Sequence, residues 1–401
     1  MRNYRRVLLG AALAASGFTA GAQTPALFKI GAVEVRPSLA YDFTYDDNIF
    51  MGHSGGNKVE DFIHSILPGV VLGAGDYRGQ TSAFFSAAYN ADFQFFMDND
   101  GANTTLHNGS LGFGVNTGRL GWRFDQTVVS QQDADVTLLA ARGRLKRVAY
   151  TSALNGVYDL GDRSNLESSF VSVYNDFDSV NAFDSWRGQA NGLLDYELTP
   201  KMHVGIGAAV GYDQVDTGVR QDRIGRNSIF EQGNVRGIWS ASEKTRISAE
   251  VGVEFRQYQG VDVDKAFLRF GVGADWKATP LTVVSLNASR GTSPANTIVN
   301  QANLRTSIDS VVTHQLSDRY KLNAAVGYSM NDFFAIEPVQ LGDFPAREDN
   351  YWFIRPSLGV KLMERAAANV FYQFARNDSD LVSNGNDFTN HRLGLNLSYS
   401  F

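Results

Sequence analysis

Hydrophobic and polar residues alternate along most of this chain with a period of two. Between residues 33 and 45, Leu39, Tyr41 and Phe43 stand at odd positions, whereas Ser38, Ala40 and Asp42 stand at even positions. The same alternation recurs at 245–255, at 320–330 and up to the final Phe401. A two-residue period places one set of side chains on each face of a β-strand. The pattern therefore predicts an all-β protein.

About eighteen segments show this alternation, and most exceed the 5–6 residues of a typical soluble strand. They match the roughly 9–11 residues that a tilted strand needs to cross a bilayer. Pro68 is expected to interrupt the second segment, and in 165–175 either face is compatible with being the apolar one. The predicted strands are 33–45, 61–73, 80–97, 106–117, 120–130, 147–160, 165–175, 183–198, 202–213, 226–240, 245–258, 265–277, 281–290, 298–316, 320–332, 351–362, 366–376 and 388–401.

The connections between these segments alternate between short and long. Turn-forming residues (Gly, Pro, Asp and Ser) mark the short ones at 74–79, 117–119, 161–164, 199–201, 241–244, 278–280, 317–319 and 363–365. The longer connections are predicted at 46–60, 131–146, 214–225, 331–350 and 377–387. Alternation of this kind is typical of outer-membrane barrels, which have short periplasmic turns and longer extracellular loops.

We therefore predict a closed antiparallel transmembrane β-barrel of about 18 strands, in the porin size class, over residues 33–401. Only a closed barrel satisfies every strand N–H and C=O in lipid. An even strand number places both termini on the periplasmic side. The terminal Phe401 fits this prediction, because outer-membrane barrels commonly end on an aromatic residue.

The N-terminal residues have the pattern of a secretory signal. Arg2, Arg5 and Arg6 precede a short apolar run at 7–20, and Ala20-Gly21-Ala22 forms a small-x-small cleavage motif before Gln23. A membrane anchor would need roughly 20 apolar residues. We predict a cleaved signal peptide at 1–22, a short periplasmic segment at 23–32, and insertion into the outer membrane of a Gram-negative bacterium.

Composition narrows the function classes. The chain has no Cys, which excludes a disulfide framework, thiol catalysis and a lipoprotein anchor. Its net charge of −6 argues against a nucleic-acid partner. The mean hydropathy of −0.21 is compatible with a barrel, because alternating lipid-facing and lumen-facing residues average to near neutral.

Many charged residues fall on the polar positions of the predicted strands. If these positions faced lipid, each mid-membrane Arg or Lys would cost roughly 2–4 kcal/mol, so we assign them to the lumen. Mixed charge on this wall suits a hydrated polar solute, and the alternative is a solvated, paired wall without selectivity. The candidate lumen-lining residues are Arg36, Arg123, Arg187, Arg236, Arg246, Glu250, Glu254, Arg256, Arg269, Asp275, Arg355, Lys361 and Arg392.

No motif predicts catalysis, a cofactor or a metal site. The six His are scattered and none forms HExxH, and no Ser/His/Asp set can be assembled. The DNDGAN stretch at 98–103 lacks the twelfth-position Glu of a calcium loop. Acids predicted in loops could bridge divalent cations to lipopolysaccharide phosphates or simply solubilise the loops. These acids are Asp46, Asp47, Asp98, Asp100, Asp133, Asp135, Asp176, Asp178, Asp213, Asp216, Asp262, Asp264, Asp378 and Asp380.

The first strand ends in an unusual polar group, Tyr45-Asp46-Asp47-Asn48. The alternative to a metal site is that this group caps the strand, because Asp and Asn side chains bond their own backbone. We predict the capping role, with Tyr41, Phe43 and Tyr45 forming part of an aromatic girdle at the outer interface.

Two stretches resemble outer-membrane β-barrel porins associated with exopolysaccharide export loci. The first is residues 36–50, with Tyr45, Asp46, Asp47 and Asn48, and the second is residues 59–75, with Pro68 and Gly69. The aromatic third strand "TSAFFSAAYNADFQFF" continues the resemblance. The resemblance implies no catalytic residues. It implies a conduit for secreted exopolysaccharide that works with a periplasmic export partner and contacts outer-membrane lipid and lipopolysaccharide. The alternatives are a passive diffusion porin for small polar solutes and, less in keeping with the motifs, a barrel enzyme. The predicted loop 331–350 is apolar enough to fold inward as a constriction or a gate.

Overall fold

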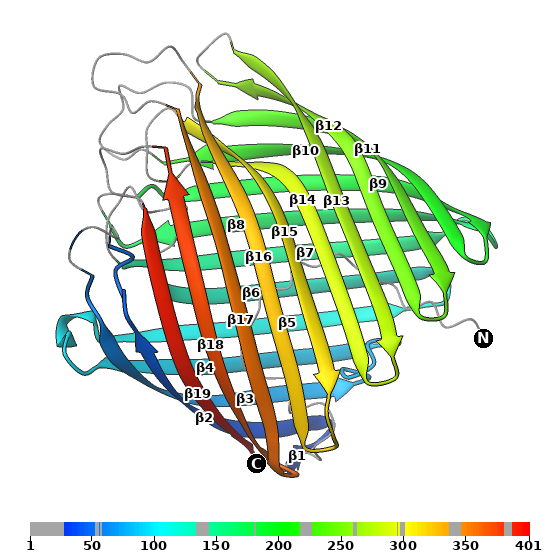
Figure 1. Ribbon diagram of the computed structural model, residues 1–401. Helices are drawn as coiled ribbons and strands as arrows, with labels where there is room; N and C mark the ends of the chain where they lie inside the picture. Colours follow the sequence, from blue (N-terminus) through cyan, green and yellow to red (C-terminus); the bar gives the residue numbers. More distant parts are fainter. Residues whose placement is uncertain are drawn as a thin grey trace.

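The computed structural model describes residues 28–52, 56, 58–133, 144–179, 182–216, 227–259, 263–294, 296, 301–336, 346–380 and 387–401. Within these ranges the regular structure is nineteen β-strands and one short 3₁₀ helix, η2 (Asp100–Ala102). The strands wrap around a single axis (Figure 1). They are β1(Phe28–Ile30), β2(Val33–Asp46), β3(Asp61–Gly75), β4(Phe84–Phe96), β5(Thr104–Asn116), β6(Leu120–Asp133), β7(Leu145–Asp159), β8(Ser164–Phe177), β9(Ser185–Thr199), β10(Met202–Val215), β11(Ser228–Ser242), β12(Thr245–Tyr258), β13(Asp264–Thr279), β14(Thr282–Pro294), β15(Gln301–Gln315), β16(Tyr320–Ala335), β17(Arg347–Met363), β18(Ala366–Ser379) and β19(Phe388–Ser400).

Each strand from β2 onward pairs antiparallel with the next, and β19 pairs with β2 to complete the ring. This closing pair runs from Ser400 opposite Ser38 to Arg392 opposite Asp46. The remaining strand, β1, pairs with the part of β2 that β19 does not reach, with Phe28 opposite Val35. The prediction of a closed antiparallel transmembrane barrel of 18 strands is confirmed, with β1 as an addition inside the predicted 23–32 segment.

The strand boundaries differ from the predicted ones in a few instructive places. β3 continues through Pro68, so the expected interruption of the strand is wrong. Only its ladder to β4 lacks the pairs of Leu67 and Pro68, and the register is the same on both sides, with Ile66 opposite Phe93 and Gly69 opposite Asn90. Proline has no N–H to donate, and this strand tolerates it because its ladder to β2 is continuous. β16 and β17 extend into the predicted loop 331–350, so both ends of that loop were assigned wrongly. Residues 337–345, and residues 1–27 with the predicted signal peptide, lie outside the described ranges.

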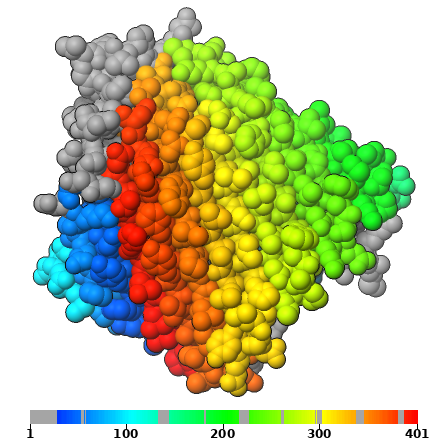
Figure 2. Space-filling view, viewed as in Figure 1, coloured from blue at the N-terminus to red at the C-terminus, as the bar shows by residue number. Residues whose placement is uncertain are grey.

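The two faces of the barrel have opposite chemistry. Large apolar side chains point outward and are exposed, among them Ile206 at 66%, Val235 at 61% and Phe255 at 58%. Figure 2 shows the outward side chains of β13 to β19 as oblique bands across one face. The positions between them carry the charged and amide residues. An apolar exterior around a polar interior is the arrangement that lipid stabilises in a closed barrel.

The short turns lie at one end of the barrel and the predicted long loops at the other. β1 and the end of β19 lie at the turn end (Figure 1), where the Phe401 N–H donates to the Pro37 carbonyl at 3.0 Å. In the described parts of the chain, no helix has the length and apolarity needed to cross a membrane.

Candidate functional site

The inner wall of the barrel is the candidate site, because it gathers the polar side chains. All thirteen candidate residues lie on the strand face opposite the exposed apolar side chains. Their role in lining a conducting path stays a prediction. Arg36, Arg123, Arg246, Asp275 and Lys361 lie toward the turn end, Arg236, Glu250 and Arg355 near mid-strand, and Arg187, Glu254, Arg256, Arg269 and Arg392 toward the loop end.

The middle of the inner wall combines charges of both signs. The guanidinium of Arg355 lies 4.1 Å from the Phe371 ring centroid. Phe371 in turn covers Gly394, where a Cβ atom would collide with its ring. Asp42, which accepts a hydrogen bond from Asn396, interacts electrostatically with both Arg355 and Asp92. Strands β2, β4, β17, β18 and β19 thus contribute to one mixed-charge region, which we call the mid-wall group: Asp42, Asp92, Arg355, Phe371 and Asn396.

Other inner-wall charges form close ion pairs. Arg236 donates to both oxygens of Glu167, at 2.8 and 2.9 Å, and to Asp195 at 3.1 Å. Arg123 donates through Nε to Asp125 at 2.5 Å. Such pairs hold neighbouring strands in register and leave little charge for a solute.

At the turn end, one side chain folds back over the mouth of the barrel. Tyr77, in the connection between β3 and β4, donates its hydroxyl to Glu34 at 2.6 Å. The guanidinium carbons of Arg36 and Arg78 each lie 5.5 Å from its ring centroid. Burial, followed by the hydrogen bond to Glu34, raises the pKa of Tyr77 above its ordinary value, so the hydroxyl stays a donor. Sequence reasoning assigned Tyr77 only to a turn; the adjacent Gly73, whose Cβ position the ring fills, was the available signal.

At the loop end, the Tyr45-Asp46-Asp47-Asn48 group joins the first barrel strand to the last. Asp46 accepts hydrogen bonds from the Asn48 N–H at 2.9 Å, as the capping hypothesis expects. It also accepts from the Asn390 side chain at 2.5 Å and from Arg392 Nε at 2.7 Å. The local cap is therefore part of a larger contact with β19, which sequence reasoning did not anticipate.

The two residues that follow extend the same contact. Asp47 accepts from the His391 backbone N–H at 2.6 Å and from Lys58 Nζ at 3.2 Å. The Asn48 side chain donates to the carbonyls of Gly52 and Thr389, at 2.9 and 3.1 Å, and accepts from the Gly52 N–H at 2.7 Å. Every donor and acceptor of the Asn48 amide group is used, so this residue specifies both the loop entry and the position of β19.

A second loop-end cluster unites four of the predicted residues, and we call it the arginine cluster: Arg187, Asp213, Glu254, Arg256 and Arg269. Arg187 donates to both Asp213 oxygens at 2.5 and 2.7 Å, and Arg256 also donates to Asp213. Arg256 Nε lies 2.9 Å from Glu254. Arg256 and Glu254 are only 3% and 2% exposed, so they do not line open water as expected.

Asp213 shows what the sequence missed. We expected it among the loop acids, whereas it lies on β10, is 1% exposed and forms salt bridges with Arg187 and Arg256. Asp46 is likewise a buried strand residue. Neither carboxylate is free to bridge cations to lipopolysaccharide. The alternation along 202–213 was the signal, because it places Asp213 on the same face as Gly211.

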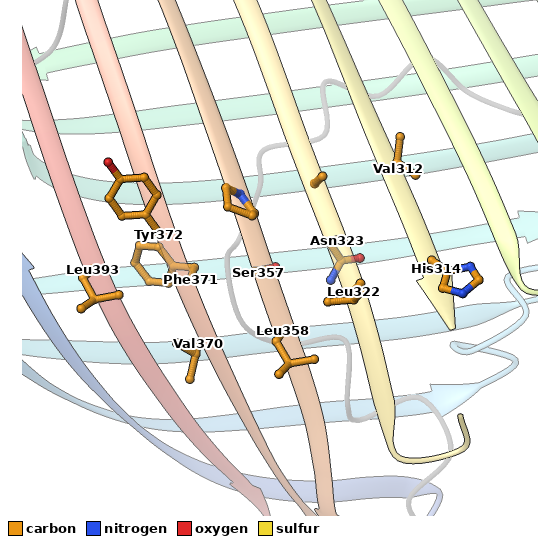
Figure 3. A pocket seen from close by; sticks show the side chains of 12 residues that line it. Val312, His314, Leu322, Asn323, Ser357, Leu358, Val370, Phe371, Tyr372 and Leu393 are labelled. Atoms are coloured by element: carbon orange, nitrogen blue, oxygen red, sulfur yellow. The ribbon is translucent and has the colours of Figure 1, made fainter. Parts of the chain in front are cut away.

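The outer wall carries the remaining polar features. A hollow of about 570 Å³ surrounds Pro356 and is lined mainly by outward apolar side chains such as Val312 and Leu393 (Figure 3). Three histidines pair with tyrosines on the outward face: His64 with Tyr41, His107 with Tyr89, and His391 with Tyr372, at 2.6 to 2.8 Å. In the part of the chain that the structure describes, no three His, Asp or Glu side chains converge as metal ligands.

Comparison with known proteins gives likeness in fold only. No family model matches the chain, and no curated protein matches it. The exopolysaccharide resemblance therefore stays a prediction. Solved structures that are similar include OccK3 (OpdO) of Pseudomonas aeruginosa, with 13% identity and a TM-score of 0.46 over 92% of this chain and 95% of that one. OccAB4 of Acinetobacter baumannii has 11% identity and a TM-score of 0.49 over 92% and 98%. Pseudomonas aeruginosa OpdK with vanillate has 10% identity and a TM-score of 0.47 over 92% and 99%. With every one of these TM-scores below 0.5, the likenesses do not establish a shared function.

Proposed function

We propose that this chain is an outer-membrane channel of a Gram-negative bacterium, through which small polar solutes diffuse passively. Both termini lie in the periplasm, and the outward face contacts outer-membrane lipid and lipopolysaccharide. The observation that carries the proposal is the mid-wall group inside an apolar-faced barrel. Asp42 and Arg355 are both only partly buried, so their charge reaches the lumen.

Charges of both signs on one stretch of wall suit a small hydrated solute. Rings and rows of charged side chains set the selectivity of aqueous pores, because they replace part of the solute's hydration. Arg355 stacks on Phe371 and has no carboxylate within salt-bridge distance among the described residues. It therefore contributes a positive field to the lumen, whereas the charge of Arg236 is balanced by Glu167 and Asp195.

Bilayer recordings test this proposal. The purified protein is expected to conduct ions in planar bilayers, and Arg355→Ala is expected to shift the reversal potential in a salt gradient toward cation selectivity. Arg376→Ala is the matched control, because Arg376 is exposed on the outward face and paired with Asp378 at 2.6 Å. Absence of conductance, or equal reversal potentials for the two variants, would contradict the proposal.

A conduit for secreted exopolysaccharide, working with a periplasmic export partner, is the second candidate. One observation favours it: aromatic side chains follow one another along the inner wall, with ring centroids of Phe388 and Tyr351 6.4 Å apart and those of Tyr351 and Phe353 6.1 Å apart. Aromatic rings offer flat apolar faces, and the apolar faces of sugar rings stack on such surfaces.

Gene deletion separates the two candidates. Lowered uptake of small solutes with normal surface polysaccharide supports the diffusion channel. Loss of surface polysaccharide with unchanged solute permeability supports the conduit and rejects the first proposal.

A further inference from the structure

The pairing between β13 and β14 stops before either strand ends. Its last pair toward the loop end is Phe270 opposite Arg290. β13 nevertheless continues along β12 to Asp264 opposite Gln257, and β14 continues along β15 to Pro294 opposite Ala302. The two strands leave a common turn and diverge toward the loop end in Figure 1. Residues 264–269 and 291–294 therefore form edges that the β13–β14 ladder does not join.

The two edges overlap instead of leaving a gap. Inward side chains of β12 and β13 contact outward side chains of β15 and β16: Tyr258 packs with Ala302, and Phe267 lies 5.3 Å from Phe334 between ring centroids. An inward face can touch an outward face only if one sheet lies outside the other. The loop-end part of β12–β13 thus covers the outside of β14–β16. We call this contact the overlap: Tyr258, Lys265, Phe267, Thr292, Ala302 and Phe334.

Side chains, not a backbone ladder, hold the overlap closed. The arginine cluster reaches across it to Thr292 of β14: Arg256 donates to the Thr292 hydroxyl at 2.8 Å, and Arg187 donates to the Thr292 carbonyl at 2.9 Å. Lys265 Nζ donates to the Ala335 carbonyl at 3.2 Å and lies 4.1 Å from the Phe334 ring centroid. These side-chain contacts can break without loss of backbone hydrogen bonds between paired strands. Opening the wall elsewhere would break a continuous ladder of backbone hydrogen bonds.

The lining of the overlap indicates what would enter it. Tyr258, Phe267 and Phe334 supply apolar surface, and Leu268 and Phe255 beside them are exposed to lipid at 56% and 58%. The arginines beside the overlap are already paired with carboxylates: Arg187 and Arg256 with Asp213, and Arg256 and Arg269 with Glu254. Lys265, in the overlap itself, has no carboxylate within salt-bridge distance among the described residues. An apolar surface next to one cation without a paired carboxylate matches a molecule with an acyl chain and an anionic headgroup.

We propose that the overlap is a lateral portal between the lumen and the outer leaflet, and that it admits a single-chain anionic amphiphile such as a fatty acid. The opening step is separation of β12–β13 from β14–β16, with the β13–β14 ladder below Phe270 as its hinge. This lateral route does not depend on the passage of polar solutes along the barrel axis.

Thiol labelling tests the opening, because the chain has no native Cys. Ala302→Cys, 4% exposed in the overlap, is expected to react with a bilayer-dissolved maleimide about tenfold faster than Ala91→Cys. Ala91 is the matched control: it is 6% exposed, it lies on the outward face between Tyr89 and Phe93, and it pairs with His107 of β5. Equal labelling rates would show that the overlap stays shut and would overturn the proposal.

Photolabelling with a diazirine fatty acid in vesicles tests the ligand class. Adducts are expected on β12, β13 and β15 residues of the overlap. They are expected to disappear when Phe267→Cys and Phe334→Cys are joined by a reducible cross-linker, and to return on reduction. Ionic conductance of the cross-linked protein is expected to be unchanged, which separates this result from the channel proposal. Adducts that persist after cross-linking, or that lie only on the outward apolar band, would overturn the portal.

Discussion

Arg392 and Asp46 face each other in the last pair of the β19–β2 ladder, and Arg392 Nε lies 2.7 Å from Asp46 Oδ2. The pair thus stands where the first and last strands of the barrel meet. Asp46 is fully buried and also holds Asn390 and the Asn48 N–H. The ring is closed at its loop end by one carboxylate that binds three partners.

Asp46→Ala is expected to weaken closure of the barrel. It leaves the buried Asn48 N–H and the buried Asn390 amide without their acceptor, which costs about 1–3 kcal/mol each, and it leaves the partly exposed Arg392 without its carboxylate. We expect a lower unfolding midpoint, measured as the loss of the fast-migrating folded form on gels of heated samples. Asp378→Ala removes an exposed carboxylate from the outward face and is the control. Equal midpoints for the two variants would show that closure does not depend on Asp46.

The double variant Asp47→Ala with Asn48→Ala is expected to impair assembly or loop order without loss of any chemistry. Both side chains bind backbone groups of the β19 start and of Gly52, so their role is positional. Yield of folded barrel and protease sensitivity of the 49–60 connection would report the change. A variant that folds normally but no longer conducts would assign the group to transport instead.

The alternation of hydrophobic and polar residues was enough to predict the strands and which side chains face the lumen, because both depend on local periodicity. Eighteen barrel strands and their inward charges follow from counting odd and even positions. The partners of these charges do not follow, since Asp213 meets Arg256 through strands whose curvature the sequence does not state. The overlap is hidden for the same reason: residues 264–269 and 291–294 continue the alternation of their strands, and only the missing pairs between them reveal the divergence. The contact of Tyr77 with Glu34 was not predicted from the sequence, because the direction of the turn depends on the space that Gly73 leaves for the Tyr77 ring.

Gly394→Ala is expected to alter conductance through Phe371. The added Cβ would collide with the Phe371 ring, which must then swing away and take its contact with Arg355. We expect a changed single-channel conductance and a selectivity shift in the direction of Arg355→Ala. Gly271→Ala is the control, because an added Cβ there meets nothing within 4 Å on the same inward side of a strand. Identical conductance for both alanine variants would place Phe371 outside the conducting path.

Arg256→Met is expected to destabilise the loop end of the barrel more than any exposed-charge variant. It leaves Glu254 and Asp213 buried with one fewer cation, and breaking a buried pair from one side costs about 3–5 kcal/mol. A double variant Arg256→Met with Glu254→Gln is expected to recover part of this loss, because it removes the uncompensated carboxylate along with its partner. Urea unfolding in detergent micelles measures the difference. Recovery in the double variant would mean that Arg256 and Glu254 stabilise β12 as a balanced pair of charges. A double variant no more stable than Arg256→Met alone would mean that packing of the Arg256 side chain against Phe230, 4.6 Å from its ring centroid, is what holds β12 in place.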